Sequence, residues 1–357
     1  MKIISARYVL PIAAEPIENG AVAVENDKII SVGTTEEIKE KFPEIIIENY
    51  GEAAILPGFV NAHSHLEITA MRGFLDDVED DFFAWLMKLT KARAEHLTET
   101  DVKNAAVFGA LEGARAGVTC FGDIGRMGVA GFEALKKNGL RGIIFQETEF
   151  SPDDKTAADD FEKLKIKFLQ LQELETDLVK VGISPHAPYS VGQKLFEKIA
   201  GYAITENIKI SVHAAESLQE KALLETGEGF FADVYKNYGF EWQSPNCSPI
   251  EYLDKIGVLK AKPLLAHCIN VSDSDIALIK NSDSKIAHCP KSNAKLGHGI
   301  APLEKFLEAE IAVGFGSDSV ASNNTCDILE ESRFAALLAR TRNDKKRFLN
   351  AKEIIET

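Results

Sequence analysis

The sequence predicts an α/β fold, a (β/α)₈ TIM-type barrel preceded by a small β unit. Beyond residue 54, eight apolar runs alternate with charge-rich helical stretches, which is typical of parallel βα repeats. Polar residues of chemical interest gather near the carboxyl ends of these runs, where barrel enzymes build their sites. A doubly wound open sheet is the alternative, but it gives no reason for His or Asp to end so many strands.

Residues 1–54 read as short strands and form the expected first domain. The pairs Asn19-Gly20 and Asn26-Asp27 are turn signals between these strands. Residues 55–357 form the expected second domain, because 357 residues exceed a typical barrel of ~250.

The predicted strands of the second domain are apolar runs, and the predicted helices lie between them. The runs are 55–65, 117–124, 140–149, 178–186, 208–216, 263–268, 284–289 and 311–319. The helical stretches are 83–115, 157–176, 191–205, 272–280 and 302–309. Segment 227–250 is rich in aromatic residues, which either line a pocket or pack as an insertion around their own small core.

Charge and cysteine content restrict the partners and the compartment. The formal charge of −15 and the pI near 5.1 disfavour nucleic acid and anionic membranes, so a small-molecule partner is expected. Five scattered cysteines without a CxxC pair indicate neither a disulfide framework nor a thiolate zinc site, which fits a reducing cytoplasm. No run approaches the ~18 apolar residues of a membrane helix.

The pair His63-Ser64-His65 closes the first run. An offset of two places both imidazoles on the same side of a strand, pointing together into the barrel. A lone His at a strand end is more often structural, but the paired form at the end of an apolar strand favours a metal site.

Two further groups close later runs. His213 and Glu216 are offset by three, so the strand must break after His213 for both to face the barrel mouth, as a ligand and a proton carrier. The alternative is a buried His and a solvent-facing Glu. Asp318 lies among small residues, where it either binds a metal or caps the following helix.

Six motifs in this order carry a resemblance to a known family. They are PGFVNAHSHLE, SPHAPYS, HAAES, LLAHC, HCPKSNAKLGHG and GFGSDSVASNN. Together they resemble the amidohydrolase superfamily, in its branch of aromatic deaminases and chlorohydrolases. The resemblance implies an N-terminal β-sandwich portion, a (β/α)₈ barrel and a mononuclear centre.

The resemblance also implies roles for individual residues. It implies one divalent ion, Zn²⁺ or else Fe²⁺, with the ligands His63, His65, His213 and Asp318. It implies catalytic roles for Glu216, His267 and Asp318. His186 and Asn293 are implied as substrate contacts, and His288 as a structural residue. A second ion needs a bridging Lys, and Lys180 lies roughly 20 Å from the end of its run at ~3.3 Å per residue.

The motif HSHLEITAMRGF, a polar loop and FFAWL resemble members that act on adenine-containing nucleosides. The substrates expected are aminodeoxyfutalosine first, and methylthioadenosine or S-adenosylhomocysteine second. Candidate contacts to the sugar or tail are Glu67, Arg72 and Glu149. The alternatives are dechlorination or deamination of another heterocycle, such as a triazine, guanine or cytosine, and an inactive binding protein.

The final residues, LNAKEIIET, resemble the start of the helix after the eighth barrel strand. Relatives continue beyond this point, so we expect a chain truncated before the C-terminal sandwich strands. A cytoplasmic homodimer or higher homo-oligomer is expected.

Overall fold

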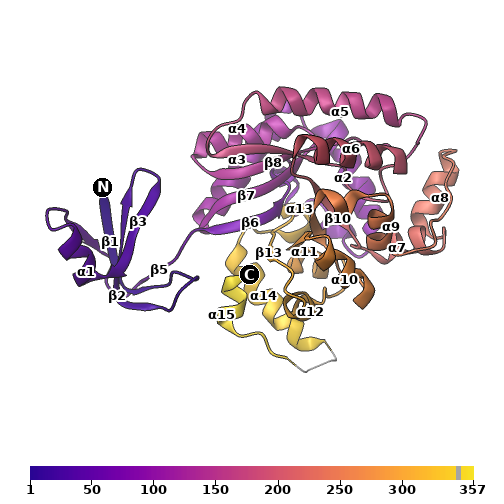
Figure 1. Cartoon of the computed structure of the whole chain (residues 1–357). Helices are drawn as coiled ribbons and strands as arrows, with labels where there is room; N and C mark the ends of the chain where they lie inside the picture. The colour runs from indigo at the N-terminus through magenta and orange to yellow at the C-terminus, as the bar shows by residue number, and fades with distance from the viewer. Residues whose placement is uncertain (343–346) are drawn as a thin grey trace. The chain divides into compact units, whose positions relative to one another are not determined.

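The computed structural model describes residues 1–342 and 347–357, and it divides into two compact units (Figure 1). The first unit comprises residues 1–58 with 351–356, and the second comprises residues 59–350 with 357. Within the described residues, the helices are too short or too polar to cross a membrane.

The first unit is built on a mixed five-stranded sheet. Its strands are β1 (Lys2–Val9), β2 (Ile17–Glu25), β3 (Lys28–Thr34), β4 (Ile47–Asn49) and β5 (Ala54–Ile55). The order is β3-β2-β1-β4, with β5 also paired to β1; β1 runs antiparallel to β2 and parallel to β4 and β5. Ile3, Ala21 and Ala23 pack against Ile38 of helix α1 (Thr35–Lys41), and α15 (Ala351–Glu356) belongs to the same unit.

One of the two turn predictions in this unit is confirmed and the other is wrong. Asn26-Asp27 joins β2 to β3, where Glu25 pairs with Lys28 and Asn26 has a φ of 55°. Asn19-Gly20 instead lies inside β2. A Cβ at Gly20 would lie 2.6 Å from Cγ2 of Val9, so this glycine permits close packing against β1 rather than a chain reversal.

The described residues of the second unit form eight strands in two parallel four-stranded sheets. The first holds β6 (Phe59–Ser64), β7 (Val118–Gly125), β8 (Arg141–Glu147) and β9 (Val179–Ser184) in sequence order. The second holds β10 (Ser211–Ala214), β11 (Leu264–His267), β12 (Lys285–His288) and β13 (Val313–Phe315). Each predicted apolar run therefore contains one strand, as buried parallel strands require. Isolated parallel bridges join Ile183 to Ile210 and Ser64 to Asp318.

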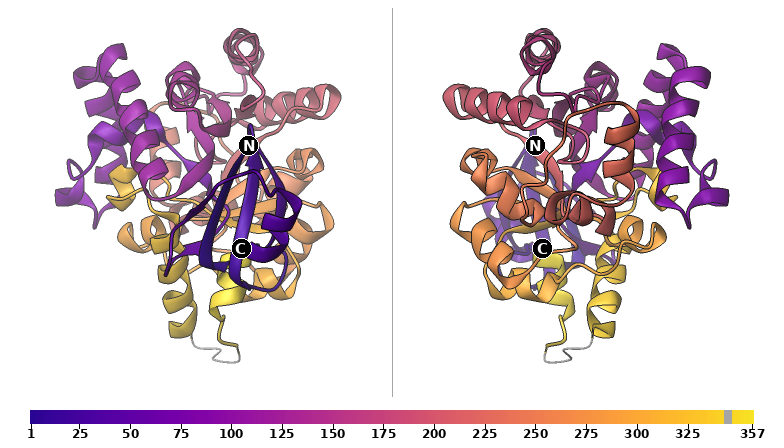
Figure 2. Two further views of the ribbon diagram at one scale, coloured as in Figure 1. Left: turned by 90° about the vertical axis from the view of Figure 1, so that its left-hand side faces the viewer. Right: turned by 90° about the vertical axis from the view of Figure 1, so that its right-hand side faces the viewer.

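The helices between these strands include α2 (Phe82–His96), α3 (Glu99–Arg115), α4 (Gly128–Asn138), α5 (Ala157–Gln172) and α6 (Gln193–Glu206). Figures 1 and 2 show α3 to α6 together along one side of the β6–β9 sheet. The later helices are α7 (Leu218–Glu225), α8 (Phe230–Asn237), α9 (Pro249–Lys255), α10 (Asp273–Asn281), α11 (Pro290–Lys295), α12 (Leu303–Glu308), α13 (Val320–Asn323) and α14 (Ile328–Thr341).

The stretch 83–115, expected as one helical region, is two helices. Thr98 separates the two helices because it caps the N-terminus of α3. Its hydroxyl oxygen accepts a hydrogen bond from the backbone N–H of Asp101, and the carboxylate of Asp101 accepts one from the backbone N–H of Thr98. This capping box satisfies backbone donors that a continuous helix would satisfy internally.

Glycines allow neighbouring strands to approach β6 closely. A Cβ at Gly122 in β7 would lie 2.4 Å from the carbonyl oxygen of Ala62. A Cβ at Gly316, directly after β13, would lie 2.7 Å from Cβ of His63 and 2.9 Å from its backbone nitrogen. The position of His63 therefore depends on the absence of a side chain at residue 316.

We predict that Gly316→Ala lowers the thermal unfolding midpoint, because the added methyl must displace the backbone of His63. Overpacking of this kind typically costs about 1–3 kcal/mol. The matched control is Gly201→Ala in α6, where a Cβ meets nothing within 4 Å. That change should leave the midpoint unchanged or raise it, because replacing a glycine inside a helix by alanine increases the free energy of unfolding by up to about 1 kcal/mol. Equal midpoints for the two variants would contradict the prediction.

Candidate metal centre and substrate cavity

A cavity in the second unit lies at the carboxyl ends of its strands. Polar groups enter it from six strand ends: His65, Glu147, His186, His213, His267 and Asp318. Glu216 and two arginines, Arg93 and Arg126, also line it. Carboxyl ends of parallel strands are where α/β enzymes place their ligands.

Three of these side chains, those of His65, His213 and Asp318, converge with His63, which is buried behind the cavity lining. His65 Nε2 lies 3.2 Å from His213 Nε2. Asp318 Oδ1 lies 3.5 Å from His63 Nε2 and 3.6 Å from His65 Nε2. His63, His65 and His213 bring one nitrogen each to within 4.8 Å of one another and could hold a metal ion.

The electrostatics of this cluster suit a cation. Burial lowers the pKa of His63, His65 and His213, so each imidazole is neutral and offers a lone pair. Burial would raise the pKa of Asp318, but its contact with His63 and the neighbouring imidazoles outweigh this and lower it well below its usual range. Among the described residues, neither ring nitrogen of His63 has a hydrogen-bond partner. Neutral imidazoles with one carboxylate are a donor set that Zn²⁺ takes.

The backbone turns sharply where these side chains leave their strands. Five residues that are not glycine have left-handed φ values at or just after the carboxyl ends of strands: His186 at 62°, Ala215 at 52°, His267 at 72°, Cys268 at 48° and Asp318 at 55°. Ala215 follows the end of β10, so the strand breaks where the offset of His213 and Glu216 requires it. This break brings Glu216 back to the cavity. Such strain persists where the surrounding structure fixes it, and it clusters at functional sites.

Glu216 is buried between two imidazoles. Its Oε1 lies 3.6 Å from Nε2 of His267 and 3.7 Å from Nε2 of His298. Burial, reinforced by the charge of Asp318, raises the pKa of Glu216 to about 8. His267 is oriented by Asn293, whose Oδ1 lies 2.9 Å from Nδ1. His298 was not predicted from the sequence, although it belongs to the HCPKSNAKLGHG motif.

Asp318 is fixed by hydroxyl groups from two helices. Ser292 and Ser322 donate to its Oδ2 at 2.6 and 3.0 Å. Behind them, Asn323 donates at 2.6 Å both to the carbonyl of Ser317 and to the buried carboxyl of Glu331. The orientation of Asp318 thus depends on α11, α13 and α14.

Only part of the predicted set of substrate contacts lines the cavity. His186 does, and its Nδ1 pairs with Ser190 Oγ at 2.5 Å. Glu67 is buried behind the wall, where it binds Arg93 and accepts from the backbone of residues 126 and 127. Arg72 pairs with Glu112 away from the cavity.

Two more predicted contacts lie off the cavity. Asn293 stands behind His267, as described above. Glu149 is 60% exposed and pairs with Lys167 at 3.0 Å, because β8 ends two residues earlier, at Glu147. The predicted run 140–149 ends at Glu149, which lies beyond the last residue of β8.

Arg93, Arg126 and Glu147 were missed from the sequence. Arg126 and Glu147 stand at the carboxyl ends of β7 and β8, so the rule used for the histidines applies to both. Arg93 comes from the middle of α2, and no sequence signal marks it as a cavity residue.

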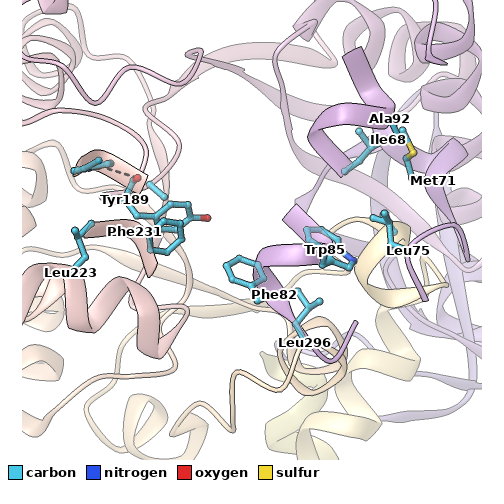
Figure 3. Close-up of a cluster of buried hydrophobic side chains, with 13 residues drawn as sticks. Ile68, Met71, Leu75, Phe82, Trp85, Ala92, Tyr189, Leu223, Phe231 and Leu296 are labelled. Carbon is cyan, nitrogen blue, oxygen red and sulfur yellow. Dashed lines mark hydrogen bonds between the residues drawn. The ribbon is translucent and has the colours of Figure 1, made fainter. Parts of the chain in front are cut away.

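The remaining wall is apolar and aromatic. Phe82, Trp85 and Leu296 line the cavity and belong to a buried cluster with Tyr189 and Phe231 (Figure 3). The ring of Tyr189 stacks on that of Phe231, with centroids 4.3 Å apart. The aromatic segment 227–250 therefore backs the wall instead of lining the cavity itself, since Phe231 and its neighbours pack behind Tyr189.

Comparisons with known proteins agree with this geometry. The Amidohydrolase family model matches residues 54–357, and a bacterial imidazolonepropionase-like composite domain matches residues 20–44. A 5'-deoxyadenosine deaminase of Methanobrevibacter smithii is 31% identical, over 90% of this chain and 69% of its own length. A 5-methylthioadenosine/S-adenosylhomocysteine deaminase of Bacillus cereus is 32% identical, over 91% and 71%.

Two solved structures of deaminases are also similar to this chain. An adenosine deaminase from Xanthomonas campestris with bound zinc superposes with a TM-score of 0.83 at 26% identity, covering 99% of this chain and 77% of that one. Helicobacter pylori aminofutalosine deaminase, in complex with methylthio-coformycin, has a TM-score of 0.80 at 25% identity, with 96% and 83% covered.

The support layer behind Asp318 yields a pH prediction. Burial raises the pKa of Glu331 to about 8, above its ordinary value of 4.5. The folded state therefore holds this proton more tightly than the unfolded state. Stability must fall as pH rises from the ordinary pKa towards about 8, by up to ~1.4 kcal/mol per pH unit for one such group.

We expect Glu331→Gln to make this decline shallower, measured as urea midpoints between about pH 5 and pH 8. The adjacent Glu330 is the matched control, because its bond to Lys291 lowers its pKa. Glu330→Gln should leave the decline in place. A Glu331→Gln profile parallel to wild type would contradict the assignment.

Proposed function

Because the chain belongs to the amidohydrolase family, we propose that it is a metal-dependent hydrolytic deaminase that acts on a C–N bond of an aromatic amine and releases ammonia. One observation carries the proposal. A set of neutral imidazoles and a carboxylate converges beside the buried acid Glu216, in one cavity. A ligand set beside a proton carrier is what metal-assisted hydrolysis requires.

The proposed scaffold is a closed (β/α)₈ barrel with a small N-terminal β-sandwich portion, as residues 55–357 and 1–54. The two isolated bridges support closure, because Ile183–Ile210 links β9 to β10 and Ser64–Asp318 links the end of β6 to the segment after β13. Closure would direct all eight carboxyl ends to one mouth.

We assign His63, His65, His213 and Asp318 as ligands of one divalent ion, Zn²⁺ in preference to Fe²⁺. The orphaned nitrogens of His63 support this fit, since a buried polar atom needs a partner. A divalent ion here supplies Lewis-acid activation of the attacking water. A bridging lysine is unsupported, because Lys180 is 54% exposed and pairs with Glu175.

In this proposal the protein's own groups move and hold the protons. Glu216 takes a proton from the attacking water and passes it to a ring nitrogen, making the carbon that bears the amino group electrophilic. The second proton of the added water then passes to the amino group, and the C–N bond breaks as ammonia leaves. Its raised pKa suits a carboxyl that is protonated in mid-reaction. His267 and Asp318 orient the water, and Asn293 and Ser292 fix those two groups in turn.

The proposed substrate is a 6-aminopurine nucleoside, with aminodeoxyfutalosine first and methylthioadenosine or S-adenosylhomocysteine second. The names of the curated relatives and of the aminofutalosine deaminase structure support this class. Arg93 and Arg126 line the cavity and suit an acidic 5′ substituent, while Phe82 and Trp85 suit a purine ring. A cytoplasmic homodimer or higher homo-oligomer remains a prediction.

We predict about one divalent ion per chain by elemental analysis, lost together with activity in His63→Ala or Asp318→Ala. Glu216→Gln separates the two properties: it should keep the ion and lower kcat by ~10²–10⁴-fold. His96→Ala, at the exposed end of α2, is the control and should keep both. Two ions per chain, or activity in a metal-free variant, would refute the ligand assignment.

The substrate prediction uses a panel of 6-aminopurine nucleosides, free adenine, guanine, cytosine and a chlorotriazine. We expect the highest kcat/KM for a nucleoside with a bulky or acidic 5′ substituent, measured by ammonia release and the ultraviolet change from adenine to hypoxanthine. Buried polar groups left unpaired by the other heterocycles should reduce kcat/KM by ~10⁴. A free base or a chlorotriazine as the best substrate would exclude the nucleoside class but not the metal chemistry.

A further inference from the structure

Glu147 holds a position that the proposed chemistry does not use. It ends β8, lines the cavity and is 4% exposed. Its Oε2 lies 3.3 Å from Nε of Arg126. Its Oε1 is buried and has no hydrogen-bond partner among the described residues. A buried carboxylate oxygen in a cavity wall needs a donor, and the described protein groups provide none.

The surroundings hold this carboxylate in place. Its partner Arg126 is anchored through its main chain, because its N–H donates to Glu67 at 3.0 Å and its carbonyl accepts from Gln146 at 2.9 Å. A carboxylate oxygen of Glu147 and one nitrogen each of His186 and His213 lie within 4.8 Å of one another. The carboxylate of Glu147 therefore belongs to a wall beside the imidazole cluster.

This trio could be read as a second metal site, but both ring nitrogens of His213 and one of His186 already have neighbours. His213 Nε2 faces His65 in the first cluster, and its Nδ1 lies 3.2 Å from the carbonyl of His186. Nδ1 of His186 pairs with Ser190. An ion bound by Glu147 would compete with the first site for His213, so a substrate donor is the better partner for the free oxygen.

The chemistry of the substrate decides which donor this is. The base of a 6-aminopurine nucleoside carries hydrogen-bond donors only on its amino group, and that group must face Glu216 and Asp318, on the β10 and β13 side. Glu147 stands on β8. The donors that all the proposed substrates then have in common are the sugar hydroxyls. Resting on the proposed function, we propose that Glu147 accepts a hydrogen bond from a ribose 2′- or 3′-hydroxyl and so selects ribonucleosides over deoxynucleosides.

The test compares zinc-loaded wild type with Glu147→Gln and Glu147→Asp on 5′-deoxyadenosine and its 2′- and 3′-deoxy analogues. Wild type should prefer the ribonucleoside over one analogue by roughly 10–100-fold in kcat/KM, the scale of a hydrogen bond to a charged group. Both variants should lose most of this preference, mainly by slower reaction of the ribonucleoside. Zinc content and thermal midpoint verify that each variant is folded and loaded.

The control is Glu133→Gln on α4, which removes an exposed acid that pairs with Lys103 far from the cavity lining. It should retain the wild-type preference. Variants of Glu147 that discriminate like wild type would overturn the proposal. Loss of zinc in Glu147→Gln would also overturn it, by identifying Glu147 as a ligand.

Calorimetric binding of purine riboside, which lacks the amino group, separates this proposal from the proposed function. If wild type deaminates nothing but binds purine riboside more tightly than its deoxy analogues, and Glu147→Gln removes that difference, the hydroxyl contact stands and deamination fails. If wild type deaminates nucleosides but Glu147 does not affect the preference, deamination stands and the contact fails. If wild type deaminates nothing and purine riboside does not bind, both fail.

Discussion

Desolvation of the imidazole cluster is the constraint on which the rest of the site depends. His63, His213 and His267 are buried together, and burial lowers the pKa of each. The same environment raises the pKa of Glu216 to about 8. Buried polar groups are usually paired, so this concentration of ring nitrogens around one carboxylate suits a shared cationic partner. The proposed ligand assignment rests on this electrostatic argument as much as on the sequence motifs.

A layer of hydrogen bonds behind the cavity fixes the positions of the side chains in this cluster. Asp123 at the end of β7 accepts from Ser64 Oγ and from the backbone of Leu66, which holds the turn just after the HSH segment. In the same way, Asn293 forms a hydrogen bond with His267, and Ser292 forms one with Asp318. Each of these groups belongs to a different element from the residue it fixes. The site is therefore rigid only when the whole strand array is assembled.

The sequence predicted the strands well because parallel strands are buried on both faces and appear as continuous apolar runs. It predicted the HSH pair and the break after His213 from side-chain alternation alone. It failed where local chemistry overrides the pattern. Gly20 serves packing against Val9 rather than a turn, and Thr98 caps a helix in the middle of a helical stretch.

The sequence did not predict most of the residues that line the cavity. The end of β8 decides whether Glu147 or Glu149 faces the cavity, and apolar content does not define that end to within two residues. Arg93 reaches the cavity only because α2 packs over the strand ends, which depends on tertiary structure. His298 approaches Glu216 from a loop whose course no periodicity describes.

The cavity lining combines apolar and charged groups, and this combination constrains any flat ligand that enters it. Phe82, Trp85 and Leu296 contribute apolar surface, while Arg126 and Glu147 contribute charged groups. A purine ring gains most by lying against the apolar residues, because aromatic and aliphatic contact area is what it can bury. Its polar substituents then have to meet the charged groups, where unpaired groups would be penalised. With the proposed ligands and the proposed Glu147 contact, this lining would couple the position of the ring to recognition of the sugar, although the two depend on different strands.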